Sequence, residues 1–221
     1  MKIAIHHSPG TFSERWIAYC ERRGIEYRIV DCYSSDIVSH LADCDALMWH
    51  FNHKSPRAGK FAKQLLYSLQ RSGKKVFPDF NTVWHFDDKI GQKYLLESIG
   101  AALVTTYIFY SKQEALEWAD KTSYPKVFKL STGSGSDNVR LVNSKSEARW
   151  LIRQAFGKGF KQYNAWSNLK ERYRKYRLGK TTLWDVIKGI ARLVHTTEYS
   201  RVTGKEIGYA YFQDYIPLND H

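Results

Sequence analysis

A lysine followed by a short run of serine and glycine is the segment of this sequence best suited to chemistry. Lys129 ends a short apolar run, and the loop after it reads Ser131-Thr132-Gly133-Ser134-Gly135-Ser136. Glycine lets successive backbone N–H groups face an anion, and serine hydroxyls add hydrogen-bond donors. A lysine beside such a loop supplies a positive charge suited to phosphate. The segment therefore predicts a phosphate site, although an ordinary glycine-serine hairpin turn has the same pattern.

Two better-known phosphate motifs do not match this loop. A P-loop requires G-x-x-x-x-G-K-[ST], which the sequence lacks. A dinucleotide fingerprint requires G-x-G-x-x-G at the start of a helix, whereas Gly133 and Gly135 are followed by the strand-like run 138–142. The order strand, loop, strand predicts a loop that covers its ligand as a flap.

The elements before the loop alternate strands with helices. Strands are expected at 2–6, 26–30, 46–50 and 75–77, with helices at 11–24, 36–41 and 56–72. The first helix begins with the capping box Thr11-Phe12-Ser13-Glu14 and ends at Gly24. This alternation predicts a parallel sheet covered on both faces, in a domain of residues 1–85.

Residues 86–221 are expected to form a second, α+β domain. Helices are predicted at 87–98, 111–121 and 144–156, and strands at 106–110, 127–130, 138–142 and 208–216. A helical insert is predicted at about 157–206, because apolar side chains recur there at three- and four-residue steps, namely at Phe160, Tyr163, Trp166, Leu169, Tyr173 and Tyr176.

Three separated pieces of the second domain resemble the ATP-grasp superfamily. In that family's order they are Asp88-Lys89 opening a helix, Tyr124-Pro125…Lys129 with its loop, and Phe212-Gln213-Asp214-Tyr215-Ile216-Pro217. The resemblance covers nearly the whole chain. The chain is similar to the ATP-binding regions of glutathione synthetase, ribosomal-protein glutamate ligase and biotin carboxylase. It implies an α/β fold: an N-terminal parallel α/β (pre-ATP-grasp) domain, then part of an α+β ATP-grasp domain that carries the basic insert.

The resemblance also implies roles for individual residues toward ATP. Lys89 and Lys129 would contact the α- or β-phosphate, and the loop residues Ser131, Gly133, Ser134, Gly135 and Ser136 would close over the triphosphate. On the adenine side, the backbone carbonyl of Asp214 would receive the amino group, and the N–H of Ile216 would meet N1. A free strand edge is expected here, because it supplies the one donor and one acceptor that an adenine edge needs. Gln213 stands where many members of the family have Glu. Tyr215 and Phe128 would be apolar walls for the adenine ring, and Asp220 or His221 would lie near the ribose.

The family's reaction joins a carboxylate, activated as an acyl phosphate, to an amine or another nucleophile. ATP and Mg²⁺ are the implied cofactors. The magnesium ligands of that family follow the adenine hinge, so they are expected outside this chain, and no metal or catalytic residue is assigned within it. We expect a truncated piece of a longer enzyme that does not by itself complete the reaction. A non-catalytic ATP-binding module is the alternative.

Charge and composition bear on partners. The net charge is +12, and residues 158–180 hold eight Lys or Arg against the single acid Glu171. This basic, aromatic segment keeps open a nucleic-acid-binding alternative, which is less favoured than an amphipathic helix whose aromatic side chains pack inward while its charges face water. The same charges would also suit an anionic membrane surface, which is not expected as a partner. The expected partners are ATP, an unidentified carboxylate and nucleophile, and, as a candidate, a second copy of the chain.

The sequence also indicates a cellular location and the state of the cysteines and histidines. No apolar run is long enough to span a bilayer and the start lacks a signal-peptide pattern, which predicts a cytoplasmic protein. The three cysteines are expected to be reduced thiols in or near a core. Four histidines follow strands of the first domain, where they are either polar loop residues or contacts for an acidic substrate: His6, His7, His50 and His53.

Overall fold

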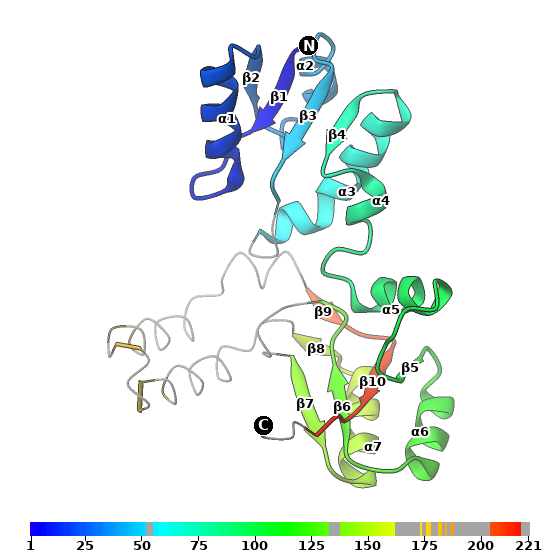
Figure 1. The fold of residues 1–221 in the computed structure, drawn as a ribbon. Coiled ribbons are helices and arrows are strands. Elements are labelled where there is room, and N and C mark those ends of the chain that lie inside the picture. The colour runs from blue at the N-terminus through cyan, green and yellow to red at the C-terminus, as the bar shows by residue number, and fades with distance from the viewer. Residues whose placement is uncertain are drawn as a thin grey trace. The chain divides into compact units, whose positions relative to one another are not determined.

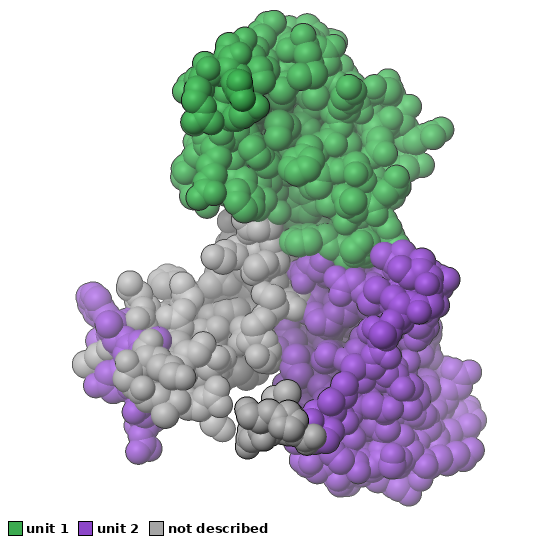
Figure 2. All heavy atoms as spheres, viewed as in Figure 1, with its two compact units in different colours: residues 1–86 green, residues 87–221 purple. Residues whose placement is uncertain are grey.

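A computed structural model describes residues 1–51, 55–132, 138–161 and 204–217, together with 173, 176–177, 181–182, 184 and 187. The chain divides into two compact units, Met1–Phe86 and Asp87–His221 (Figure 2). Each unit has its own buried apolar clusters, so each is a folded body with a separate core.

The first unit is a four-stranded parallel sheet in the order β2-β1-β3-β4 (Figure 1). Its strands are β1 (Ile3–His6), β2 (Tyr27–Val30), β3 (Ala46–Trp49) and β4 (Lys75–Phe77). Ile3 and Ile5 pack with Cys20 of α1 (Phe12–Arg23), whereas Ala4 lies in the cluster of α2 (Ile37–His40) and α3 (Pro56–Arg71). Because neighbouring residues of one strand face opposite sides, both faces are buried, which confirms the predicted doubly covered sheet.

The helix boundaries follow from local hydrogen bonds. The Thr11 hydroxyl accepts from the Ser13 N–H at 3.3 Å, and α1 ends at Gly24, whose φ of 62° favours glycine. Glu14 accepts from the N–H of Gly10 at 2.9 Å, one residue before the group that the capping box predicts. A short helix, α4 (Phe80–Val83), was not predicted, although Asp79 caps it through the Thr82 N–H at 3.0 Å.

The second unit is built on a four-stranded antiparallel sheet in the order β5-β10-β6-β7. Its strands are β5 (Thr106–Phe109), β6 (Lys126–Lys129), β7 (Val139–Val142) and β10 (Ala210–Asp214). The helices are α5 (Lys89–Ser98), α6 (Lys112–Lys121) and α7 (Lys145–Ala155). Residues of α6 and α7 share one buried cluster with Phe128 and Phe212, so these two helices cover one face of the sheet.

Two short strands at the ends of the predicted insert were not expected. β8 (Phe160–Lys161) pairs antiparallel with β9 (Lys205–Glu206), and Phe160 is the cross-strand partner of Glu206. The helix predicted to include Phe160 is therefore wrong at that residue. Its ring packs on Phe128 with a centroid distance of 5.2 Å, because a buried aromatic at the sheet surface gains more from core packing than from continuing a helix pattern.

Two further sequence expectations concern thiols and membranes. Cys20, Cys32 and Cys44 are free and buried, as predicted, and burial raises the pKa of the Cys32 thiol to about 12. Within the described ranges, no helix combines the length and apolar character needed to cross a membrane.

Candidate functional site

The sheet of the second unit has two chemically different faces. Side chains alternate along a strand, so Phe128 points to α6 and α7 while Val127 and Lys129 point to the other side. The register pairs Val127 with Gln213 and Lys129 with Tyr211, which places these four residues on one face. We call it the Lys129 face, and we call the opposite side, covered by α6 and α7, the helix face.

Phe128 does not serve as an apolar wall for a ring on the Lys129 face. It is only 2% exposed and lies between Phe160 and Phe212 in the core. The expectation for Phe128 is therefore wrong, because the alternation of β6 cannot place Phe128 and Lys129 on one side. The apolar side chains that share the Lys129 face and remain accessible are Val139 and Leu141 of β7, which are 39% and 49% exposed.

Lys129 is held by a neutral partner. Its Nζ donates to Oε1 of Gln213, and Gln213 Nε2 in turn donates to Thr106 Oγ1 at 2.8 Å and to the Tyr211 hydroxyl at 3.0 Å. Gln213 is 9% exposed, so its amide orientation is set by these three contacts. An amide oxygen accepts a hydrogen bond without cancelling the charge of the ammonium group, so Lys129 keeps its positive charge for a further anion.

Lys89 reaches the start of the glycine-serine loop from α5. Asp88 caps this helix by accepting from the N–H groups of Ile90 and Gly91, each at 3.0 Å. The Lys89 backbone N–H donates to the Ser131 carbonyl at 2.8 Å, and its Nζ lies 3.5 Å from the same oxygen. Asp87 turns the chain into the helix with a φ of 52°, a left-handed conformation that Asp tolerates better than most residues.

Electrostatics mark this corner as a place for negative charge. Burial lowers the pKa of Lys89, and burial together with the charge of Lys89 lowers the pKa of Lys129. Two ammonium groups that repel each other in a partly desolvated place are stabilised by an anion between or beside them. The structure thus brings together Lys89, Lys129 and Ser131, three of the residues predicted to hold phosphate.

Glu206 lies at this site, although the sequence does not predict it there. Its Oε2 accepts from the N–H and hydroxyl of Ser131, at 3.0 and 2.9 Å, and its Oε1 accepts from the N–H of Thr132 at 3.3 Å and from the Thr132 hydroxyl. The Tyr209 hydroxyl also receives the Ser131 N–H, at 2.7 Å. Glu206 lies about seventy-five positions further along the sequence, so no local pattern links it to the loop; the turn glycine Gly204 before it was the only signal nearby.

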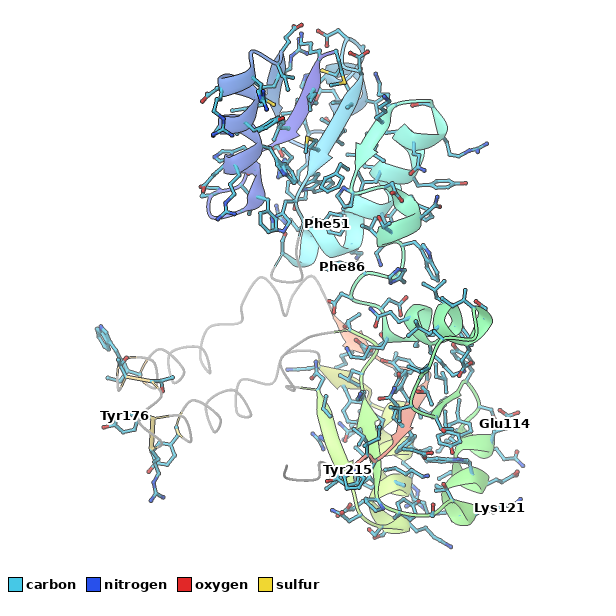
Figure 3. The ribbon with its side chains drawn as sticks, viewed as in Figure 1. Phe51, Phe86, Glu114, Lys121, Tyr176 and Tyr215 are labelled. Atoms are coloured by element: carbon cyan, nitrogen blue, oxygen red, sulfur yellow. The ribbon has the colours of Figure 1, made fainter. Side chains whose placement is uncertain are left out.

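The predicted adenine hinge differs from expectation in one respect. β10 lies between β5 and β6, so Gln213 and Asp214 are inside the sheet and do not form the free strand edge that was predicted. The Asp214 carboxylate accepts from Lys126 Nζ at 2.6 Å, and its N–H donates to the Thr105 carbonyl at 3.0 Å. Tyr215 and Ile216 follow the paired strand and are 44% and 61% exposed, with Tyr215 labelled in Figure 3.

Several predicted site residues fall outside the described residues: Gly133, Ser134, Gly135, Ser136 and Asp220. Most of the insert does so too, but Tyr173 and Tyr176 are described and are 53% and 40% exposed. The inward packing predicted for the aromatic side chains of the insert is therefore not found at these two positions. No group of three or more His, Cys, Asp or Glu able to hold a metal ion exists in the described part of the chain.

The histidines of the first unit have structural partners. His6 is 8% exposed within β1, its Nδ1 accepts from the Cys32 N–H at 3.0 Å, and burial lowers its pKa. His7 Nδ1 is 3.1 Å from Ser13 Oγ, and His50 Nδ1 accepts from the Phe12 N–H at 3.2 Å. His53 lies outside the described residues. These contacts favour structural histidines over contacts for an acidic substrate, and His6 lies in a buried strand and not in a loop.

Comparisons with known proteins agree with this architecture. No protein-family model matches the chain, and no curated protein matches it by sequence. Among solved structures, a RimK domain ATP-grasp protein from Sphaerobacter thermophilus DSM 20745 is similar with a TM-score of 0.54 and 15% identity, over 99% of this chain and 66% of that one.

A second similar structure is the biotin carboxylase domain of 2-oxoglutarate carboxylase from Hydrogenobacter thermophilus, solved with MgADP, ADP and bicarbonate. Its TM-score is 0.53 at 14% identity, over 97% of this chain and 44% of that one. This chain thus spans less than two thirds of the length of either protein. With its parallel first unit and antiparallel second unit, the chain has the ATP-grasp fold.

Proposed function

We propose that this chain binds ATP on the Lys129 face of its second unit and is the nucleotide-binding portion of an ATP-grasp ligase. The ligase would activate a carboxylate as an acyl phosphate for attack by an amine or another nucleophile. The chain spans 66% and 44% of the two similar structures, so the complete reaction, its substrates and any homodimer belong to this proposal.

One observation carries the proposal. The ammonium groups of Lys89 and Lys129 come from elements about forty residues apart, and both meet at the start of a glycine-serine loop, where Lys89 contacts Ser131. Burial lowers the pKa of both lysines, and the charge of Lys89 lowers that of Lys129 further, while Asp87, Glu206 and Asp88 partly offset the effect on Lys89. Two partly buried lysines at the start of a glycine-serine loop suit a polyanion, and a nucleotide triphosphate is an anion of that kind.

The chemistry assigned to this chain is positioning and charge neutralisation. ATP, when bound, supplies the phosphoryl group. Lys89 and Lys129 would hold its phosphates, and the accessible apolar side chains of Val139 and Leu141 would offer a surface to the adenine ring. Tyr215 and Ile216, beyond the paired part of β10, present backbone groups suited to the edge of the base. Neutralising phosphate charge with fixed lysines is the main protein contribution in phosphoryl transfer.

Magnesium is part of the same proposal, with its ligands expected outside this chain. Among the described residues there is no group of three or more His, Cys, Asp or Glu, and no step is assigned to the ion. A cytoplasmic location, likewise, remains a prediction from the sequence.

The central test is ATP binding by the Lys129→Ala variant. Removing one charge-assisted hydrogen bond is expected to weaken ATP binding by about 10- to 100-fold, since such bonds contribute about 1.5–3 kcal/mol. Isothermal titration calorimetry with wild type, Lys129→Ala and Lys121→Ala would measure it. Lys121 is an exposed lysine at the end of α6, away from the Lys129 face, so its variant should bind like wild type (Figure 3). Equal ATP affinity in all three proteins would refute the proposal.

A second function has one observation in its favour. Tyr173 and Tyr176 are exposed beside the exposed Arg177, and aromatic rings next to basic groups can stack on nucleobases while the charges contact phosphates. Binding of single-stranded RNA by this segment should fall steeply as salt rises from low concentration. If fluorescence anisotropy detects no RNA binding even at low salt, this second function is ruled out.

A further inference from the structure

The amide of Gln213 has three polar neighbours, which differ in what each can donate or accept. The ammonium group of Lys129 can only donate, and it meets Gln213 Oε1. The Thr106 hydroxyl donates its one hydrogen to the Val104 carbonyl at 2.7 Å, so toward Gln213 it can only accept. The Tyr211 hydroxyl can do either, and it lies 3.0 Å from Gln213 Nε2. Lys129 and Thr106 therefore require the same orientation of the amide.

The opposite orientation of the amide would be unfavourable at two contacts at once. It would turn the amide NH₂ group toward the ammonium group of Lys129, and the amide oxygen toward the lone pairs of Thr106 Oγ1. Water has little access to repair these mismatches, because Gln213 and Thr106 are 9% and 7% exposed. The orientation with the oxygen toward Lys129 is thus fixed from both ends of the amide.

Thr106 is itself held by the backbone around it. It is the cross-strand partner of Gln213 in the register of β5 and β10, and the N–H of Asp214 donates to the Thr105 carbonyl at 3.0 Å. The Thr106 hydroxyl is bonded to the backbone of Val104, two residues earlier in the chain. The acceptor for Gln213 Nε2 is therefore a fixed point of the sheet, which does not depend on the charge or the contacts of the lysine at the other end of the amide.

A fixed partner matters for Lys129 because lysine side chains have large rotamer freedom. Holding such a side chain in place before a ligand arrives removes part of the conformational entropy that binding would otherwise cost. We propose that Thr106 is a positioning residue, which holds the Gln213 amide with its oxygen toward Lys129 and so keeps the ammonium group in place for an anionic ligand. This inference rests on the proposed ATP site and adds to it a residue that acts through Gln213.

Replacement of Thr106 by valine tests this role. Thr106→Val keeps the shape of the side chain but leaves one N–H of a nearly buried amide without its acceptor, so the amide should turn away from Lys129. ATP affinity should fall about three- to tenfold in calorimetric titrations, and Thr106→Ser, which restores the hydroxyl, should stay within about twofold of wild type.

A matched control is available in the first unit. The Thr82 hydroxyl also donates to a backbone carbonyl, that of Asp79 at 3.0 Å, but it is exposed and far along the chain from β5 and β10. Thr82→Val should therefore bind ATP like wild type. Thermal unfolding of each variant would verify that it is folded, and Thr106→Ala, which removes the same acceptor, takes the place of Thr106→Val if that variant is unstable.

A double-mutant cycle with Lys129 separates positioning from general support of the fold. If Thr106 acts through Lys129, Thr106→Val should change ATP affinity by less than about twofold in the Lys129→Ala background. The same loss of affinity in both backgrounds would show that Thr106 supports the fold and positions nothing.

The orientation of the amide can be measured without a nucleotide. Gln213 Nε2 donates to Thr106 and to Tyr211, so its two hydrogens should exchange slowly with solvent in NMR spectra of wild type. One of them should exchange faster in Thr106→Val. Spectra of Gln213→Glu, which lacks these hydrogens, would identify the signals. Equal exchange in wild type and Thr106→Val would contradict the assigned orientation.

The outcomes separate the two proposals. If wild type does not bind ATP, the proposed function fails, and the role of Thr106 in binding fails with it. If Lys129→Ala weakens ATP binding but Thr106→Val binds ATP as well as wild type or better, only the role of Thr106 fails. A loss in Thr106→Val that is recovered in Thr106→Ser and absent in the Lys129→Ala background supports the inference.

Discussion

Two lysines three positions apart on β6 have opposite environments. Lys126 lies on the helix face, where its side chain is 7% exposed, forms a 2.6 Å ion pair with Asp214 and lies 5.4 Å from the Tyr107 ring centroid. Lys129 lies on the other face and is bonded to the neutral amide of Gln213, with a second lysine nearby. Asp214 and Gln213, the residues that these lysines contact, both belong to β10.

The difference separates a structural charge from a charge available to a ligand. A carboxylate neutralises Lys126, as a buried charge requires if it is to remain in the folded protein. The amide beside Lys129 fixes the position of the ammonium group without cancelling its charge, which leaves attraction for an external anion. Sequence neighbours with the same side chain thus serve stability in one case and binding in the other.

The largest effect is expected from breaking the structural pair. Asp214→Asn should lower the free energy of unfolding by about 2 kcal/mol, because it leaves the buried Lys126 charge unpaired; the cost stays below that of fully buried pairs since Asp214 is 37% exposed. Urea denaturation would measure it. Asp120→Asn, which breaks a more exposed pair with Arg149, is the control and should cost less than about 1 kcal/mol. A larger loss of unfolding free energy for Asp120→Asn than for Asp214→Asn would contradict the structural role given to the Lys126 pair.

The two faces should also respond to pH in opposite ranges. The pKa of Asp214 is lowered from 3.8 chiefly by its hydrogen bond to Lys126, so its stabilising contribution is present above that value and is lost as pH falls through the lowered pKa. The pKa values of Lys89 and Lys129 are lowered from 10.5 by burial, so both lysines lose their protons below 10.5 in the folded protein.

ATP affinity should therefore fall, by about tenfold, as pH rises through the lowered lysine pKa values, because the phosphates lose charged donors. Calorimetric titrations between neutral pH and pH 10 would show it, and the Lys129→Ala variant should show a weaker dependence. An ATP affinity that does not change over this range would contradict the assignment of both lysines.

The smallest effect is expected from making the Lys129 site resemble the Lys126 site. Gln213→Glu places a carboxylate beside Lys129 and partly neutralises it, so ATP affinity should fall, by about fivefold or less, as expected for a partly solvated charge pair. Stability should also fall slightly, because the Tyr211 hydroxyl can turn to donate to the new carboxylate but the Thr106 hydroxyl already donates to the Val104 carbonyl at 2.7 Å. An increase in ATP affinity would show that a carboxylate at this position assists nucleotide binding.

Local patterns were sufficient for most of the fold. The Thr11, Ser111 and Ser144 caps start their predicted helices, and the alternating order of elements gave the parallel sheet of the first unit. Short-range hydrogen bonds and period-two or period-3.6 burial determine such features, and they are written in adjacent residues. The helix predicted through Phe160 failed because its partner, Phe128, lies more than thirty positions away.

The residue types of the candidate site can be recognised in the sequence alone: a glycine-serine loop with Lys129 before it, Lys89 at a helix start, and Gln213 and Asp214 near the end of a strand. The face that each side chain takes, the interior position of β10 and the contacts of Glu206 with Ser131 and Thr132 are visible in the folded unit alone. The reason is that strand pairing and charge partnership join residues tens of positions apart, and these contacts are fixed by the packing of the whole unit and not by any local pattern.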